Sequence, residues 1–393
     1  MDRIRQLDNP PPTEIVIEES RETTDCFISD LGFYSESSQL NSLISELVIN
    51  KGKRQDIKEI AAKALLYQSL LRPALSSPSA RIQIVGKIKN KNIYKDFIPI
   101  DKNSLPMLPA LNWLVKSPSR TVSSVLASLT NPKALKFMKV EAELATFIEQ
   151  NSNQIKNDSI KRSILKIGSD YLIKGETLRY TPKLLASIKT LLNSRFENKI
   201  NIEEKIYAYR SKLLGEVQCN QNLKLFDEAL YFNLPQSKTL HFTLADSRDH
   251  LMVVVSQNIN TAQNIPNTPY FRGNKFARPS TICQSQNGSY IISESTDPGQ
   301  LMHNFLNQEF DSDNRETLKN YIDKSRYLLI FDPTRILFES KNAEQSLLNR
   351  LLRMDIPIMH RKKIGKLWIT QSDQKTRVYL DGRYKSYGIC PNN

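Results

Sequence analysis

The alternation of apolar and polar residues predicts several β-strands in this chain. Two alternating stretches within residues 81–100 flank Lys89-Asn90-Lys91-Asn92, which is typical of a β-hairpin with a four-residue loop. Residues 239–244 also alternate, whereas residues 251–255 form an unbroken apolar run rich in valine, as expected of a strand buried on both faces. Further strands are predicted at residues 327–331 and within residues 356–389.

Apolar residues at helical spacing dominate the N-terminal half. Residues 39–72 predict two helices, because Ile57, Ile60, Ala61 and Ala64 lie on one helical face after a break near Gly52. From about residue 105 to residue 232 the pattern is again helical, and Asn and Thr stand before prolines as helix caps do. The helices expected there lie near residues 132–150, 154–173, 182–194 and 202–215.

Together these elements predict an α+β protein. We expect a helical N-terminal bundle with an inserted β-hairpin, followed by a mixed α/β C-terminal part. The expected divisions are an acidic flexible arm at residues 1–35, a mainly helical domain at 36–235 with its hairpin at 81–100, and a mixed α/β domain at 236–393 with short C-terminal strands.

Charge adds the strongest compositional signal. The chain has 393 residues with a formal net charge of +14, but residues 1–50 carry −7, which leaves +21 on the remainder. A body this basic attracts polyanions, so nucleic acid is the expected partner, and the acidic arm could compete with it or recruit a protein. An anionic membrane surface or an acidic protein fits the same charge.

Clusters of cations with aromatic side chains indicate where single-stranded nucleic acid would bind, because bases stack on aromatic rings and cations neutralise phosphates. The alternative is that the aromatic residues anchor loops into the core while the charges face water. The candidate residues are Lys87, Lys89, Lys91, Lys95, Tyr270, Phe271, Arg272, Lys275, Phe276, Arg278, Arg361, Lys362, Lys363, Lys366 and Trp368.

Signals for catalysis are weaker. Asp246, Asp249 and His250 could bind a metal or transfer protons, but a polar turn between two strands explains the same residues better, so no metal site is predicted. Residues 269–273 with Ser280-Thr281 bear a slight resemblance to ADP-ribosyltransferase motifs, with Glu294 as the acid, although the two pieces lie closer together than in that family. His360 is a further candidate acid or base.

The absence of several sequence motifs argues against several classes of protein. No GxxxxGK[ST] or GxGxxG loop is present, so a P-loop NTPase or Rossmann dehydrogenase is not expected, and no cofactor is predicted. The four cysteines are far apart, which predicts free thiols in a reducing compartment. Residues 1–5 lack the start of a secretory signal and no apolar run is long enough to span a membrane, so the protein is expected inside the cell, in cytoplasm or nucleus.

The sequence therefore favours a non-catalytic nucleic-acid-binding protein, with single-stranded RNA slightly preferred, such as a genome-packaging or replication accessory protein. One alternative is an enzyme of the C-terminal part, a nuclease or a group transferase, provided that its candidate acids and bases converge in one pocket. The other is an effector or scaffold whose basic surface binds an acidic protein or a membrane.

Overall fold

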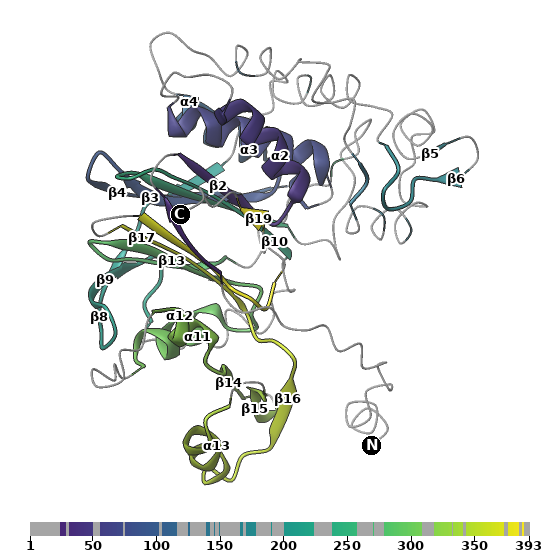
Figure 1. Cartoon of the computed structure of the whole chain (residues 1–393). Helices are drawn as coiled ribbons and strands as arrows, with labels where there is room; N and C mark the ends of the chain where they lie inside the picture. The colour runs from purple at the N-terminus through teal and green to yellow at the C-terminus, as the bar shows by residue number, and fades with distance from the viewer. Residues whose placement is uncertain are drawn as a thin grey trace.

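Two stacked β-sheets form the centre of the molecule in the computed structural model (Figure 1). Within each sheet every pair of neighbouring strands is antiparallel. The structure describes residues 24–28, 31–49, 56–73, 75–101, 104–115, 125, 139–141, 145, 149, 166–167, 170–177, 190, 200–223, 238–257, 270, 279–308, 318–331, 333–340, 343–372, 376–384 and 387–388.

Each of these sheets has seven strands. Sheet I runs in the order β1 (Thr24–Ile28), β18 (Thr376–Leu380), β17 (Lys366–Ser372), β13 (Gly288–Ser293), β12 (Thr281–Gln284), β9 (Gly215–Cys219) and β8 (Tyr207–Ser211). Sheet II runs in the order β19 (Tyr387–Gly388), β2 (Gly32–Ser35), β10 (Lys238–Ala245), β11 (His250–Gln257), β3 (Arg81–Ile88), β4 (Lys91–Pro99) and β7 (Ile200–Glu203). Strands from both halves of the sequence therefore pair within each sheet.

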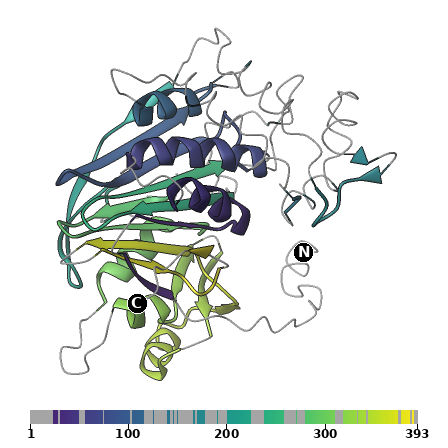
Figure 2. The same ribbon diagram turned by 45° about the horizontal axis from the view of Figure 1, so that its top comes forward.

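Helices cover the outer face of each sheet, which gives four layers (Figure 2). Helices α2 (Ser38–Ile49), α3 (Ile57–Leu71) and α4 (Met107–Val115) pack on sheet II, and α11 (Pro298–Leu306) and α12 (Leu318–Asp323) lie beneath sheet I. The side chain of Asp56 caps α3 and that of Asp297 caps α11, whose first residue is a proline.

The packing of the core explains why some strands have continuous apolar sequences. In β11, Leu251, Val253 and Val255 pack with the helices, whereas Met252 and Val254 pack in the core between the sheets. Because successive side chains point to opposite faces and both faces are covered, every position in this strand is buried.

A third, smaller sheet lies at the end of the molecule next to α11 and α12 (Figure 1). It contains β14 (Tyr327–Phe331), β15 (Thr334–Glu339) and β16 (Ile358–Arg361), and α13 (Gln345–Leu352) joins the parallel strands β15 and β16. Ile336, Phe338 and Leu351 form its core. Elsewhere β5 (Lys166–Ile167) pairs with β6 (Asp170–Tyr171).

The prediction of a helical N-terminal bundle is wrong. Residues expected to form a helix at 202–215 instead contribute to β7, β8 and β9, and Tyr209 and Ser211 point inward while Ala208 and Arg210 are exposed. This is a period of two, which the acidic residues before it obscured because they suit the start of a helix. The helices expected near 132–150, 154–173 and 182–194 fall largely outside the described residues, as do residues 1–23 of the predicted arm.

Several local predictions are confirmed. The hairpin at 81–100 is β3 and β4, although its turn is the two residues Lys89 and Asn90, both with positive φ, rather than four. Residues 239–244 and 251–255 lie in β10 and β11, and residues 327–331 are β14. No helix among the described residues is long and apolar enough to cross a membrane.

The expectation of free thiols is wrong for two cysteines. Cys219 of β9 and Cys283 of β12 form a disulfide, with their Cα atoms 4.1 Å apart. They are 64 residues apart in sequence, but the register places them directly opposite each other across the two strands. Sequence spacing alone does not reveal this pairing. The side chains of Cys26 and Cys390 lie outside the described part of the chain.

Candidate functional site

Four strand ends meet at one end of the two-sheet sandwich and bring polar side chains together. Thr239 is the second residue of β10, Ser293 is the last of β13, and Lys366 is the first of β17. Glu36 follows β2, and Glu294 follows β13. We call this cluster the Thr239 site.

Thr239 is the central residue of the site. Its side chain is buried, and its hydroxyl lies 3.1 Å from the Ser293 hydroxyl and 3.1 Å from the Glu294 carboxylate. Its backbone N–H donates to the same Glu294 oxygen at 3.0 Å. The carboxylate of Glu294 therefore contacts both the nitrogen and the hydroxyl of one threonine.

Lys366 supplies the positive charge of the site. Its Nζ lies 2.8 Å from Glu36, 3.2 Å from Glu294 and 3.4 Å from the carbonyl oxygen of Thr239. Burial disfavours the charged ammonium, but the two carboxylates outweigh burial and raise the pKa of Lys366. Lys366 is therefore a fully charged, buried cation next to Thr239.

The pKa values of the two carboxyl groups that contact Lys366 shift in opposite directions. Burial raises the pKa of Glu36 above its ordinary value, and the neighbouring Glu294 adds to that shift. Burial also opposes ionisation of Glu294, but Lys366 and the N–H of Thr239 outweigh it and lower the pKa of Glu294. Glu294 is thus the more acidic of the two carboxyl groups and the one that contacts Thr239.

The backbone at Glu294 has a φ of 49°, a left-handed conformation that costs a non-glycine residue about 1–3 kcal/mol. Strain of this kind persists where surrounding contacts fix the residue, and it is common at active sites. Here the contacts are those to Thr239 and Lys366.

Tyr384 lies with its ring 4.9 Å from Lys366 Nζ, and burial raises the pKa of its hydroxyl.

His241 extends the site along β10. Its Nε2 lies 2.9 Å from the Ser293 hydroxyl, and its Nδ1 lies 3.9 Å from Glu36. The backbone N–H of His241 donates to Glu36 at 3.0 Å. Burial, together with the charge of Lys366, lowers the pKa of His241 well below its ordinary value, so the ring is neutral.

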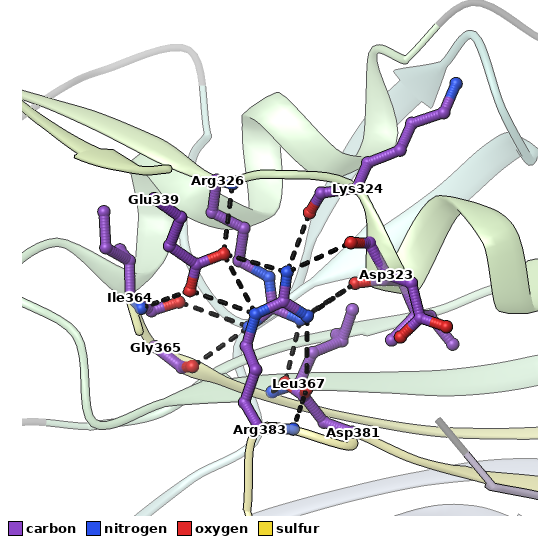
Figure 3. Close-up of polar contacts among 10 residues, drawn as sticks. Asp323, Lys324, Arg326, Glu339, Ile364, Gly365, Leu367, Asp381 and Arg383 are labelled. Carbon is purple, nitrogen blue, oxygen red and sulfur yellow. Dashed lines mark hydrogen bonds and ion pairs between the residues drawn. The ribbon is translucent and has the colours of Figure 1, made fainter. Parts of the chain in front are cut away.

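A buried ionic network fixes the backbone on both sides of Lys366 (Figure 3). Arg326 donates to the carbonyl oxygens of residues 364 and 365, at 3.2 and 3.0 Å, and pairs with Asp381. Asp381 in turn accepts the N–H of residue 367 at 3.1 Å. Glu339 accepts the N–H of residue 364 at 2.6 Å, and Arg383 pairs with both Glu339 and Asp381. The backbone is therefore held at residues 364 and 365, just before β17, and at residue 367 within it.

The sequence-predicted nucleic-acid residues do not gather at this site. In the hairpin, Lys89 and Lys91 are exposed, whereas Lys87 donates to the carbonyl of Gln286 and Lys95 pairs with Glu204. Arg361, Lys362 and Lys363 are exposed at and beyond the end of β16. Phe271, Arg272, Lys275, Phe276 and Arg278 lie outside the described residues.

Three of these candidates are buried rather than exposed, which corrects their predicted role. Tyr270 is 0% exposed and belongs to the core beneath the helices. Trp368 packs between the two sheets, so neither ring offers a face to a base. Lys366 contacts two carboxylates and has no free charge for a phosphate.

The candidate acids and bases are scattered. Asp246 and Asp249 form the polar turn between β10 and β11, at the opposite end of the strands from Thr239, as the simpler interpretation predicted. His250 is buried there against Ser289. His360 is exposed in β16, so of the five candidates only Glu294 belongs to the Thr239 site. No group of three potential metal ligands is present among the residues that the structure describes.

Sequence reasoning missed Thr239, Glu36, Ser293 and Tyr384. Lys366 had a detectable signal, because it begins an alternating segment in which Trp368 and Thr370 share its face. A lysine at an inward position of a strand requires a buried carboxylate partner. Nothing in the sequence near position 366 identifies that partner as Glu36, which is 330 residues away.

Comparison with known proteins shows the fold. The sequence matches no family model and no curated protein. A threonine-to-alanine variant of LmbA2991 superimposes with a TM-score of 0.65 at 9% identity, over 94% of this chain and 99% of the other. Cephalosporin acylase from Bacillus halodurans gives 0.60 at 10% identity, over 98% of this chain and 99% of the other. The four-layer architecture thus resembles the N-terminal-nucleophile (Ntn) hydrolase and acylase folds.

This result overturns the prediction of a non-catalytic nucleic-acid-binding protein. A solved structure with the same fold over nearly its whole length is an acylase, whereas the predicted stacking residues Tyr270 and Trp368 are buried in this chain. The likeness at 9–10% identity concerns the fold, and the chemistry has to come from the residues themselves.

Proposed function

We propose that this chain is an acyl-transferring hydrolase in which Thr239 is the nucleophile. The observation that carries the proposal is the contact of one ionised carboxylate, that of Glu294, with both the hydroxyl and the nitrogen of Thr239. Nucleophilic catalysis typically uses a nucleophile, an adjacent proton acceptor and a third group that orients the acceptor. Here Lys366 is the group that orients Glu294. The substrate class is an amide or a related acyl compound.

In this proposal Thr239 first becomes an N-terminal residue. Its hydroxyl oxygen attacks the carbonyl carbon of Lys238, the carbon–nitrogen bond breaks, and the nitrogen of Thr239 takes up a proton. The resulting ester between Lys238 and the Thr239 oxygen is then hydrolysed by water, which leaves a carboxylate on Lys238. Lys238 is exposed at the start of β10 and directly precedes the buried Thr239.

Cleavage would create the base that turnover needs. A backbone amide nitrogen is not basic, whereas a free α-amino group has a pKa of about 7.7–8.0, close to that of an effective general base. The Thr239 nitrogen already lies 3.0 Å from Glu294, which would hold the new amine beside the hydroxyl. The hydroxyl would then attack the acyl carbon of the substrate, expel its amine with the abstracted proton, and release the acid after attack by water.

The experiment is a search for a chain that begins at Thr239. We expect intact mass and N-terminal sequencing of the purified protein to show cleavage between Lys238 and Thr239, and Thr239→Ala to abolish it. Thr243→Ala is the matched control, because it removes the same atoms from a buried position on the same strand away from Glu294. Uncleaved wild-type protein that also resists acylating probes at Thr239 would rule the proposal out.

We further propose an oxidising compartment for this protein, in place of the reducing one expected from free thiols. The disulfide between Cys219 and Cys283 supports it, because disulfides persist in oxidising surroundings and are rare in the cytosol.

A further inference from the structure

The first cleavage step needs a group that accepts the proton of the Thr239 hydroxyl. The two nearest groups, the Thr239 nitrogen and the Glu294 carboxylate, are poorly suited to this role. Before cleavage the nitrogen of Thr239 belongs to a peptide bond, so its electron pair is delocalised. The Glu294 oxygen that contacts the Thr239 hydroxyl also accepts the Thr239 N–H and pairs with Lys366, so its lone pairs are already engaged. The hydroxyl of Thr239 must therefore lose its proton by another path.

A chain of two hydrogen bonds leads from Thr239 to a neutral imidazole. The Thr239 hydroxyl lies 3.1 Å from the Ser293 hydroxyl, which lies 2.9 Å from Nε2 of His241. Thr239 and His241 are two residues apart on β10, so both side chains point to the same face, toward β13 of the other sheet. All three residues are buried, with exposures of 4%, 1% and 3% for Thr239, Ser293 and His241.

The surroundings of His241 keep its ring uncharged. Burial and the charge of Lys366 from β17 favour the neutral imidazole, so Nε2 can accept a hydrogen bond from Ser293. Glu36, in the segment after β2, lies 3.9 Å from Nδ1 and would stabilise the positive charge when the ring takes a proton. The ring of Trp368 meets His241 edge-on at 5.4 Å, and Glu294 faces the other end of the chain, at Thr239.

We infer that Ser293 and His241 form the proton relay for the cleavage at Thr239, an inference that rests on the proposed function. As the Thr239 oxygen attacks Lys238, its proton passes to Ser293 while the Ser293 proton passes to His241. When the carbon–nitrogen bond breaks, His241 returns its proton to Ser293, and Ser293 donates one to the departing nitrogen of Thr239, because the Thr239 oxygen is by then the ester oxygen. The relay is required for cleavage alone, because the free amine replaces it afterwards.

The molecule contains a matched control for this relay. Ser289 and His250 form a second buried pair, with the serine hydroxyl 2.9 Å from Nε2, at the opposite end of β13. This pair has the same chemistry, burial and distance as Ser293 and His241 but no contact with the Thr239 site. Substitutions in the two pairs therefore disturb the packing similarly and differ in the proposed chemistry.

The test is a time course of cleavage after synthesis of the full chain in a cell-free translation system, followed by gel electrophoresis. We expect Ser293→Ala and His241→Gln to slow cleavage about 100-fold or more, the usual contribution of a general base. Ser293→Thr, which keeps the hydroxyl, should restore most of the rate. Ser289→Ala and His250→Gln should cleave at the wild-type rate, and thermal unfolding of all variants checks that they fold.

The outcomes separate the two proposals. Cleavage of Ser293→Ala at the wild-type rate overturns the relay and leaves Thr239 as the nucleophile. Equal slowing of the Ser293 and Ser289 variants also overturns it, because the effect would then be one of packing. A wild-type chain that never cleaves removes the proposed function and the relay with it.

Discussion

The carboxylate of Glu294 lies 3.0 Å from the backbone nitrogen of Thr239 and 3.1 Å from its hydroxyl. The two residues are 55 positions apart: Thr239 lies in β10 of sheet II, and Glu294 directly follows β13 of sheet I. Their contact depends on Lys366, which neutralises Glu294 and allows an ionised carboxylate to remain buried next to a threonine. The stability of this end of the molecule is therefore tied to one ammonium group.

Removing that ammonium should destabilise the fold strongly. Lys366→Met leaves Glu36 and Glu294 partly buried without a cation, and breaking a buried pair from one side costs about 3–5 kcal/mol. Urea denaturation measures the loss. Lys362→Met is the control, because Lys362 is exposed and its substitution should stay within about 0.5 kcal/mol. Equal effects of the two substitutions would contradict the ion-pair account.

Buried His250 makes stability depend on acid pH. Burial, with the nearby charge of Lys87, lowers its pKa from 6.5 to about 3, so below pH 6.5 the unfolded chain takes up a proton that the folded protein resists. The free energy of unfolding should therefore fall as the pH drops from 6.5 toward 3, by on the order of 4 kcal/mol from this group. His250→Gln should flatten the decline, whereas His360→Gln, at an exposed position, should leave it unchanged.

Asp381 should contribute a second acid transition. Burial opposes its charge, but Arg326 and Arg383 outweigh burial and lower its pKa below 3.8. A lowered pKa stabilises the fold fully above the unfolded value, and this contribution is lost as the pH falls through the folded value. Asp381→Asn should cost about 3–5 kcal/mol near neutral pH and reduce the slope below about pH 4. Asp355→Asn, in the exposed turn after α13, provides the comparison in the same denaturation series.

The disulfide predicts how the cleaved protein behaves on a gel. Cys219 precedes Thr239 and Cys283 follows it, so the bond would join the two products of the proposed cleavage. We expect a single band under denaturing, non-reducing conditions and two bands after reduction. Cys283→Ser should give two bands without reductant. Two bands from the oxidised wild-type protein would show that Cys219 and Cys283 are not bonded in the cleaved form.

Local patterns in the sequence predicted the elements that depend on neighbouring residues alone. The hairpin at 81–100 and the strands at 239–244 and 251–255 follow from periods of two and from valine-rich runs, and α3 follows from helical spacing. The polar turn at Asp246 and Asp249 is of the same kind. The short strands β7, β8 and β9 were misread, because four or five residues carry too little periodicity to outweigh the acidic residues before them.

The candidate site could not be predicted because it depends on register between distant segments. Glu36 follows β2, whereas Thr239 lies in β10 and Lys366 in β17, and these three strands come together only after both sheets have formed. Charge was the misleading signal: the excess of lysine and arginine suggested a surface for phosphates, whereas Lys366 and Arg326 are buried with carboxylate partners. Counting charges along a chain does not distinguish a solvated cation from one enclosed in an ion pair.

The disulfide also determines the molecularity of folding. The chain between Cys219 and Cys283, closed by the sulfur bridge, is a covalent ring that includes Thr239. A single cut in a ring leaves one connected molecule, so the cleaved protein would unfold and refold as a first-order process, independent of its concentration. Reduction would separate the two pieces and turn refolding into a second-order encounter. The redox state of the surroundings would then determine whether a cleaved molecule, once unfolded, can recover by itself.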